Sequence, residues 1–301
     1  LLSPYHLPLL LPMLGYAIAL LGLSLLFGTA GLVSFGHAMF VASGAYAAAA
    51  LAGRLGVRSF ELAVAAAIVG AIVLAVPIGL LCMRYTKIFF GMLTLAFGML
   101  FHSFLFKFYA VTGGDQGMRL PRPTLLGNSF PDLSKTEFLT GPFYWACLLL
   151  FVLAALLMWR IVQSPLGLAL RAQRENPRKA EYLGIAVHRA RFVAFVVSAA
   201  YGAVGGAILA VPTGLADPEL AYWTHSGVLV FMTLLGGFGH FLGPVVGAFA
   251  YVLLQDTLMS HTQYWRLAMG ALLALMVVAF PGGLMGVFAL ARGRLDRRRA
   301  A

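Results

Sequence analysis

The chain has 301 residues, of which 61% are hydrophobic and only 10% are charged, and its mean hydropathy is +0.91. A soluble domain carries roughly 25% charged residues, so this composition excludes a water-soluble fold. The net charge of +11 raises the possibility of nucleic-acid binding, but the distribution of the basic residues along the chain is explained by membrane topology, as described below. Cys82 and Cys147 lie in apolar runs without metal-ligand spacing, so neither a disulfide framework nor a metal site is predicted.

Apolar runs of about 20 residues recur along the chain, and this length matches the hydrocarbon thickness of a bilayer. The runs do not alternate polar and apolar residues, so they predict helices rather than the strands of a barrel. We therefore expect an all-α, polytopic transmembrane helical bundle, a single domain over residues 1–301 with about nine spans, some of which can be re-entrant or broken. The expected spans are residues 7–27, 36–53, 60–83, 88–108, 143–161, 192–211, 226–237, 243–258 and 264–280.

Three polar segments lie outside these spans. Residues 109–142 are rich in Gly, Pro and mixed charge and predict a folded external loop, whereas residues 163–191 and the tail 291–301 are strongly basic. When the spans alternate, one membrane face collects 14 basic and 3 acidic residues and the other collects 7 of each. Cytoplasmic loops carry the excess of Lys and Arg, so the net charge reflects topology and the C-terminus is expected in the cytoplasm. No nucleic-acid partner is expected.

Because the chain begins at Leu1 rather than Met, we also expect an N-terminal segment upstream.

A short motif repeats. FGH occurs at residues 35–37 and again at 238–240, and residues 35–51 and 238–254 are identical at seven of seventeen positions. Paired, glycine-interrupted hydrophobic segments point to the substrate path of many transporters. We therefore predict an internal repeat, parallel or inverted, that borders a translocation path. The candidate residues are Gly36, His37, Gly44, Gly239, His240 and Gly247.

Three roles remain open for the histidines of this motif. His37 and His240 can each be a polar residue at a helix end that bonds to a backbone carbonyl. Each can instead line the gate or the pathway, or take part in a proton relay.

The chain contains no phosphate-binding loop, zinc-protease motif or nucleophile elbow. We therefore expect that it is not an enzyme and needs no cofactor of its own. A transporter without its own ATP-hydrolysing domain is either a stand-alone ion-coupled carrier or channel, or a permease that depends on a separate ATPase. In the second case the ATPase would bind the ATP and Mg²⁺.

The basic segment 163–191 bears on this choice. Asn176 and Pro177 have the pattern of an N-cap followed by a proline in the first helical turn, and Gly184 suits a helix C-terminus. A short helix over residues 177–183 could lie on the membrane surface and couple the chain to an ATPase. A solvated, positively charged loop is the alternative. The candidate coupling residues are Arg171, Arg174, Glu175, Asn176, Pro177, Arg178, Lys179, Glu181 and Gly184.

Motifs spread over nearly the whole chain resemble the permease subunits of branched-chain amino acid ABC importers, a family that also serves urea, amide and aromatic-acid uptake. The motifs are GLVSFGHAMFVASGAYAAA (31–49), TGGDQGM (112–118), SPLGLALRAQRENPRKAEYLGI (164–185), LLGGFGHFLGPVVGA (234–248) and PGGLMGVF (281–288).

This resemblance implies a multi-pass protein of the bacterial inner membrane, surrounded by lipid. The implied partners are a second, homologous permease, two cytoplasmic ATPase subunits and a periplasmic binding protein. It also implies that the arginine-rich segment contacts an ATPase and that the loop residues Thr112, Gly113, Gly114 and Asp115 lie near the binding-protein entrance. The substrate stays open among leucine-like amino acids, urea, amides and aromatic acids.

Overall fold

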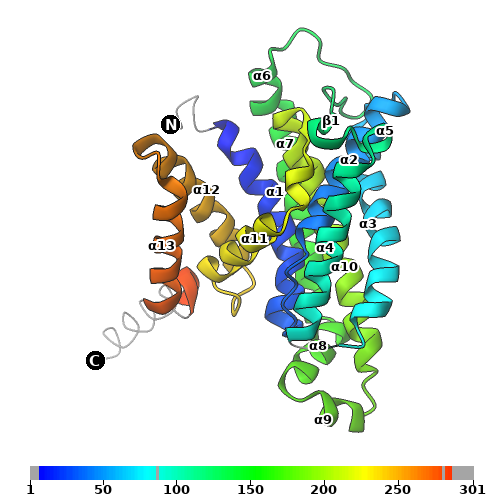
Figure 1. Cartoon of the computed structure of the whole chain (residues 1–301), viewed down its shortest axis with the longest axis vertical. Coiled ribbons are helices and arrows are strands. Elements are labelled where there is room, and N and C mark those ends of the chain that lie inside the picture. Colours follow the sequence, from blue (N-terminus) through cyan, green and yellow to red (C-terminus); the bar gives the residue numbers. More distant parts are fainter. Residues whose placement is uncertain (1–6, 86–87, 280–281, 287–301) are drawn as a thin grey trace.

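The computed structural model describes residues 7–85, 88–279 and 282–286, so the predicted basic tail 291–301 lies outside the described residues (Figure 1). In this part of the chain nearly all regular structure is helical, which confirms the all-α, polytopic prediction. Nine of the helices fall on the nine predicted spans. They are α1 (Leu7–Ser24), α2 (Ala38–Arg54), α3 (Phe60–Cys82), α4 (Ile88–Lys107), α7 (Pro142–Gln163), α10 (Val187–Thr213), α11 (Trp223–Gly236), α12 (Gly243–His261) and α13 (Trp265–Ala279).

These nine helices differ in length. Among the described residues, five are long and apolar enough to cross a membrane: α1 together with a π-helical extension, η1 (Leu25–Ala30), and α3, α4, α7 and α10. By contrast, α2 has 17 residues and α11 has only 14. Non-helical backbone separates η1 from α2 at residues 31–37 and α11 from α12 at residues 237–242, so two of the predicted spans are built as short helices next to irregular segments.

The basic segment 163–191 is almost entirely helical, which differs from the expected loop with one short helix. It contains α8 (Pro165–Glu175) and α9 (Pro177–Tyr182), and α10 begins at Val187, five residues before the predicted span. α8 begins at a proline, and its apolar face buries Gly167 and Leu170. α8 was not predicted, because its short apolar stripe lies among many charged residues.

The core forms where glycines let helix backbones approach closely. α10 packs against α1, α2 and α3. A Cβ atom built on Gly206 of α10 would lie 1.8 Å from the carbonyl oxygen of Val41, and one on Gly44 of α2 would lie 1.9 Å from that of Ala203. No larger residue fits at these contacts, which is typical of helix packing inside membranes.

The two ends of the bundle carry different structures (Figure 1). At one end, here named the α6 end, lie α5 (Tyr109–Thr112), the 3-10 helix η2 (Gly114–Gln116), α6 (Lys135–Thr140) and an antiparallel pair of strands, β1 (Met118–Arg119) and β2 (Leu215–Ala216). The predicted external loop is therefore folded. At the opposite end, named the α8 end, α8 and α9 project from the bundle.

Candidate coupling and translocation site

The helix α9 is capped at both ends as predicted. The side chain of Asn176 accepts a hydrogen bond of 3.1 Å from the backbone N–H of Lys179, and Pro177 is the first residue of the helix. Gly184 adopts a φ of +81° and its N–H donates to the carbonyl of Glu181 at 2.9 Å. α9 ends at Tyr182, one residue before the predicted end. These caps fix a rigid turn of helix at the tip of the α8 end.

The tip of α9 presents apolar side chains to the exterior. Tyr182 is 89% exposed and Leu183 is 81% exposed, whereas Ala180 is buried against the rest of the segment. The charged candidates around them are also exposed: Arg171, Glu175, Arg178, Lys179 and Glu181. An apolar tip surrounded by charged residues of both signs is the form expected of a surface that docks into a partner protein.

Arg174 is directed differently from the other charged residues of this segment. Its Nη1 donates a hydrogen bond to the carbonyl oxygen of Gly28 in η1, and its guanidinium carbon lies 5.7 Å from the centroid of the Phe238 ring. The side-chain stem packs on Gly31, where a Cβ atom would lie 2.8 Å from Cγ of Arg174. Arg174 thus joins α8 to η1 and Gly31, which precede the first copy of the repeated motif, and to Phe238, which begins the second copy.

Gln173 was not predicted as a site residue. It is buried in α8, and neither atom of its side-chain amide has a hydrogen-bond partner within the described part of the chain. α8 packs there on η1 and α10. The spacing of Leu170 and Gln173, one helical turn apart, was the only sequence signal for this burial.

The first break, residues 31–37, lies between η1 and α2 and is buried at its end. A Cβ atom on Gly36 would lie 1.8 Å from the carbonyl oxygen of Thr94 in α4, so glycine is needed here. His37 is fully buried, and neither ring nitrogen has a hydrogen-bond partner among the described residues. A Cβ atom on Gly202 would lie 3.2 Å from Nε2 of His37, so Gly202 leaves room for the imidazole. His37 therefore packs inside the bundle.

The second break, residues 237–242, lies between α11 and α12 and is more open. Gly239 and His240 are exposed, and a Cβ atom on Gly239 would meet no atom within 4 Å. Gly247, seven residues after His240, packs tightly, because its Cβ atom would lie 1.9 Å from the carbonyl oxygen of Met232. Both FGH motifs thus occupy a turn before a helix, and both are followed by a glycine in backbone contact, but only His37 is buried.

The N-termini of α2 and α11 meet inside the bundle. The backbone N–H of Ala38 donates a hydrogen bond of 3.0 Å to Oγ of the buried Ser226. From this contact the two helices run to opposite ends: Arg54, the last residue of α2, bonds to the carbonyl of Ala110 at the α6 end, whereas α11 leads to Phe238 beside Arg174. Ser226 could not be predicted as a contact residue, because one serine in an apolar run has no distinctive spacing.

The predicted residues of the external loop shape the α6 end. Oγ1 of Thr112 donates to the carbonyl of Leu105 at 2.5 Å, while Gly113 and Gly114 both have positive φ, +77° and +59°. Asp115 is exposed on this turn. The turn leads into β1, which pairs with β2, so the loop 109–142 is bonded to the segment that leads to α11.

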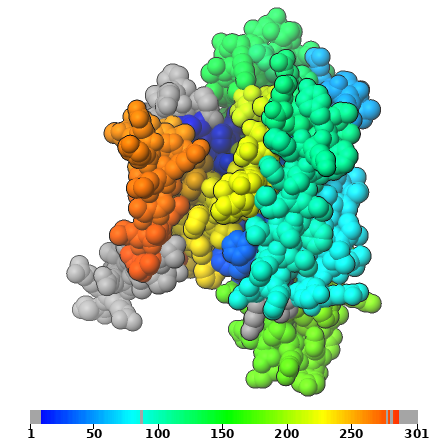
Figure 2. All heavy atoms as spheres, viewed as in Figure 1, coloured from blue at the N-terminus to red at the C-terminus, as the bar shows by residue number. Residues whose placement is uncertain are grey.

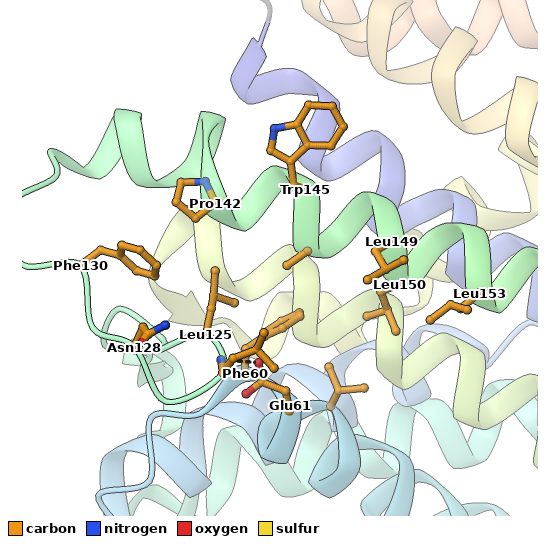
Figure 3. Close-up of a pocket in the computed structure, with 13 residues that line it drawn as sticks. Phe60, Glu61, Leu125, Asn128, Phe130, Pro142, Trp145, Leu149, Leu150 and Leu153 are labelled. Carbon is orange, nitrogen blue, oxygen red and sulfur yellow. Dashed lines mark hydrogen bonds between the residues drawn. The ribbon is translucent and has the colours of Figure 1, made fainter.

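Two cavities lie near these elements. One, of about 270 Å³, lies beside the start of α11 and is lined by Leu209, Thr213, Leu215, Asp217, Glu219, Leu220 and His225. The other, of about 620 Å³, lies between α3, α7 and the loop 109–142 and is almost wholly apolar (Figure 3). The carboxylate of Glu61, which lines this cavity, accepts a hydrogen bond of 2.8 Å from the N–H of Leu126. Glu61 therefore already has a structural role, which is to hold the loop that contains Leu126.

Comparison with known proteins gives consistent matches over most of the chain. Residues 7–280 match the family described as branched-chain amino acid transport system, permease component. The chain is 28% identical over 287 residues to the high-affinity branched-chain amino acid transport system permease protein LivM of Escherichia coli K12, covering 90% of this chain and 67% of the relative. It is 27% identical over 288 residues to LivH of the same organism, covering 90% and 91%. No solved structure matches significantly.

Proposed function

This chain belongs to the family of branched-chain amino acid transport system permease components, and from that premise we propose its place in an ATP-driven importer. It is a multi-pass membrane permease and not itself an enzyme. We propose that it translocates branched-chain or other hydrophobic amino acids, or a related small solute, delivered by a periplasmic binding protein. ATP hydrolysis takes place in two separate cytoplasmic subunits, and a second permease completes the pore.

The contacts of Arg174 carry this proposal. ATPase subunits bind the exposed tip of α9 and displace α8, and Arg174 transmits the displacement to Gly28 and to Phe238. Gly28 lies within η1, which leads to α2, and Phe238 lies in the turn that follows α11. Their movement shifts the short helices that meet at Ala38 and Ser226, which opens the path to one membrane face and then the other.

In this arrangement the α8 end faces the cytoplasm of a bacterial cell, and the α6 end faces the binding protein. α11 lies at the surface between α4 and the pair α12 and α13 (Figure 2). Trp223 and Phe231 are exposed along it, and Gly227 has open space around it. We place the second permease against this face, with the substrate path between the two subunits.

The test uses the assembled complex of both permeases and both ATPases in proteoliposomes. Changing Tyr182→Ser together with Leu183→Ser should release the ATPases and abolish ATP-driven uptake, because docking loses its apolar contact. Leu126→Ser is the matched control, since Leu126 is 85% exposed at the α6 end. Retention of ATPases and uptake in the double variant would refute the docking surface.

The alternative, a stand-alone ion-coupled carrier or channel, is not favoured by the family. It predicts uptake by the chain reconstituted without ATPases. The same vesicles, prepared with and without the ATPase subunits, separate the two functions: uptake that requires both ATPases and ATP supports the importer.

A further inference from the structure

A basic pocket at the α8 end is not used by the coupling site. It lies between the end of α3 and the start of α10, has a volume of about 660 Å³, and is lined by Arg84, His188 and Arg189 together with apolar residues. A cavity of this size holds a ligand of drug-like dimensions.

The charge of the pocket favours an anion. Arg84 follows the last turn of α3, while His188 and Arg189 belong to the first turn of α10, so the two guanidinium groups come from different helices. Among the residues that the structure describes, no carboxylate lines the pocket, and the first turn of α10 contains no acidic residue. The two arginines set the sign of the charge, since the negative end of the α3 dipole opposes the positive end of the α10 dipole at this junction.

The apolar lining residues lie further from the helix ends than the arginines do. Leu80 precedes Arg84 by four residues and Val193 follows Arg189 by four, so each lies about 6 Å further along its helix toward the middle of the bundle. Leu80 is 60% exposed and Val193 is 43% exposed, on two helices long enough to cross a membrane. The pocket thus has a cationic outer part at the level of the helix ends and an apolar inner part beside the bilayer interior.

The two helix ends are held together. Nδ1 of His188 donates a hydrogen bond to the carbonyl oxygen of Met83, with the two atoms 3.2 Å apart. This bond links the residue before Arg84 to the residue before Arg189. The arginines are therefore placed on either side of a fixed junction, as a shared ligand requires.

We propose that this pocket binds an anionic phospholipid, with the phosphate between Arg84 and Arg189 and an acyl chain along Leu80 and Val193. A basic pocket between membrane helices at a membrane surface is suited to such headgroups. The exposed apolar residues favour a lipid over a free phosphate ion, which would leave them without a ligand. The site lies at a membrane surface in either orientation of the chain, so the inference does not rest on the proposed function.

The test measures lipid binding to the purified full-length chain by native mass spectrometry, titrating phosphatidylglycerol and, separately, phosphatidylcholine. The wild type should bind one phosphatidylglycerol more tightly than phosphatidylcholine. Arg84→Gln with Arg189→Gln should weaken phosphatidylglycerol binding on the order of tenfold, the effect expected of two cations near a headgroup. Arg84→Lys with Arg189→Lys should keep much of the preference. The control, Arg160→Gln with Arg171→Gln, removes the same charge from the α8 end outside the pocket and should change little.

Three results would overturn the proposal: equal affinity of the wild type for both lipids, unchanged phosphatidylglycerol binding in the Arg84→Gln, Arg189→Gln variant, or an equal loss in the control. Displacement of the lipid by millimolar inorganic phosphate would assign the site to a free anion instead. If the glutamine variant does not fold, the affinity of the wild type for phosphatidylglycerol is measured at increasing salt concentration. This affinity must fall, since salt screens the charge of the arginines, and an unchanged affinity would overturn the proposal.

Discussion

The guanidinium carbon of Arg174, in α8, lies 5.7 Å from the centroid of the Phe238 ring, in the turn between α11 and α12. The Phe238 ring in turn lies 5.1 Å from that of Phe27 in η1, measured between centroids. One side chain from the coupling segment therefore reaches a cluster formed by η1 and by the first residue of the second copy of the repeated sequence. Any displacement of α8 must either move this cluster or break the cation–π contact and the bond to Gly28.

Arg174→Ala should uncouple transport from ATP hydrolysis. The substitution removes the contacts to Gly28 and Phe238 but leaves the exposed tip of α9 in place. We expect the uptake per ATP hydrolysed to fall about two- to thirtyfold, the range for residues that connect two coupled sites. Uptake and hydrolysis are measured together in proteoliposomes.

Arg160→Ala, which removes an exposed arginine from the end of α7, is the control for Arg174. Arg174→Lys should restore little, because an ammonium group does not reproduce the flat face of a guanidinium. An unchanged ratio of uptake to hydrolysis in Arg174→Ala would contradict the role given to this residue.

The two glycines of the second copy of the motif should respond differently to a methyl group. Gly247→Ala places a Cβ atom 1.9 Å from the carbonyl oxygen of Met232, so α11 and α12 must separate. We expect a loss of about 1–3 kcal/mol of stability, as for other overpacked contacts. Gly239→Ala meets open space and should unfold at the wild-type temperature. Thermal unfolding in detergent gives both values, and equal melting temperatures of the two variants would be inconsistent with this packing.

Ser226→Ala should weaken the junction of the two short helices. The substitution leaves the buried N–H of Ala38 without its acceptor, which costs about 1–3 kcal/mol. Hydrogen exchange of peptides that cover residues 31–45 should speed up, with no change at the α6 end. Ser103→Ala, at an exposed position on α4, is the control. Unaltered exchange around Ala38 would mean that another group satisfies this N–H.

Asn176→Ala should unwind the first turn of α9. The side-chain oxygen that accepts from Lys179 is lost, and such N-cap substitutions cost about 1 kcal/mol. We expect substrate-stimulated ATP hydrolysis in the complex to fall while the two permeases still assemble. Asn176→Asp keeps the acceptor and should behave as the wild type in both assays. If Asp and Ala have the same effect, the amide of Asn176 itself, and not the cap, is what the ATPase recognises.

Much of the site was predictable where it depends on local backbone chemistry. Asn176, Pro177 and Gly184 cap α9 as their positions along the chain predict, because these effects act within a few residues. The direction of Arg174 was not predictable, because its partners, Gly28 and Phe238, lie far away in sequence. Likewise, the identical triplets that contain His37 and His240 give no hint that one imidazole is buried and the other exposed.

The sequence by itself determined that this chain is a helical membrane protein, where its spans lie, and to which family it belongs, because hydrophobic length and capping are local properties of the chain. The tertiary structure alone decided which glycines are in contact, that α2 and α11 meet at Ala38 and Ser226, and that Arg174 joins α8 to η1 and to Phe238 of the second copy of the motif. These relations depend on how helices pack across long sequence separations, and an apolar run looks the same whether its neighbour is lipid or another helix.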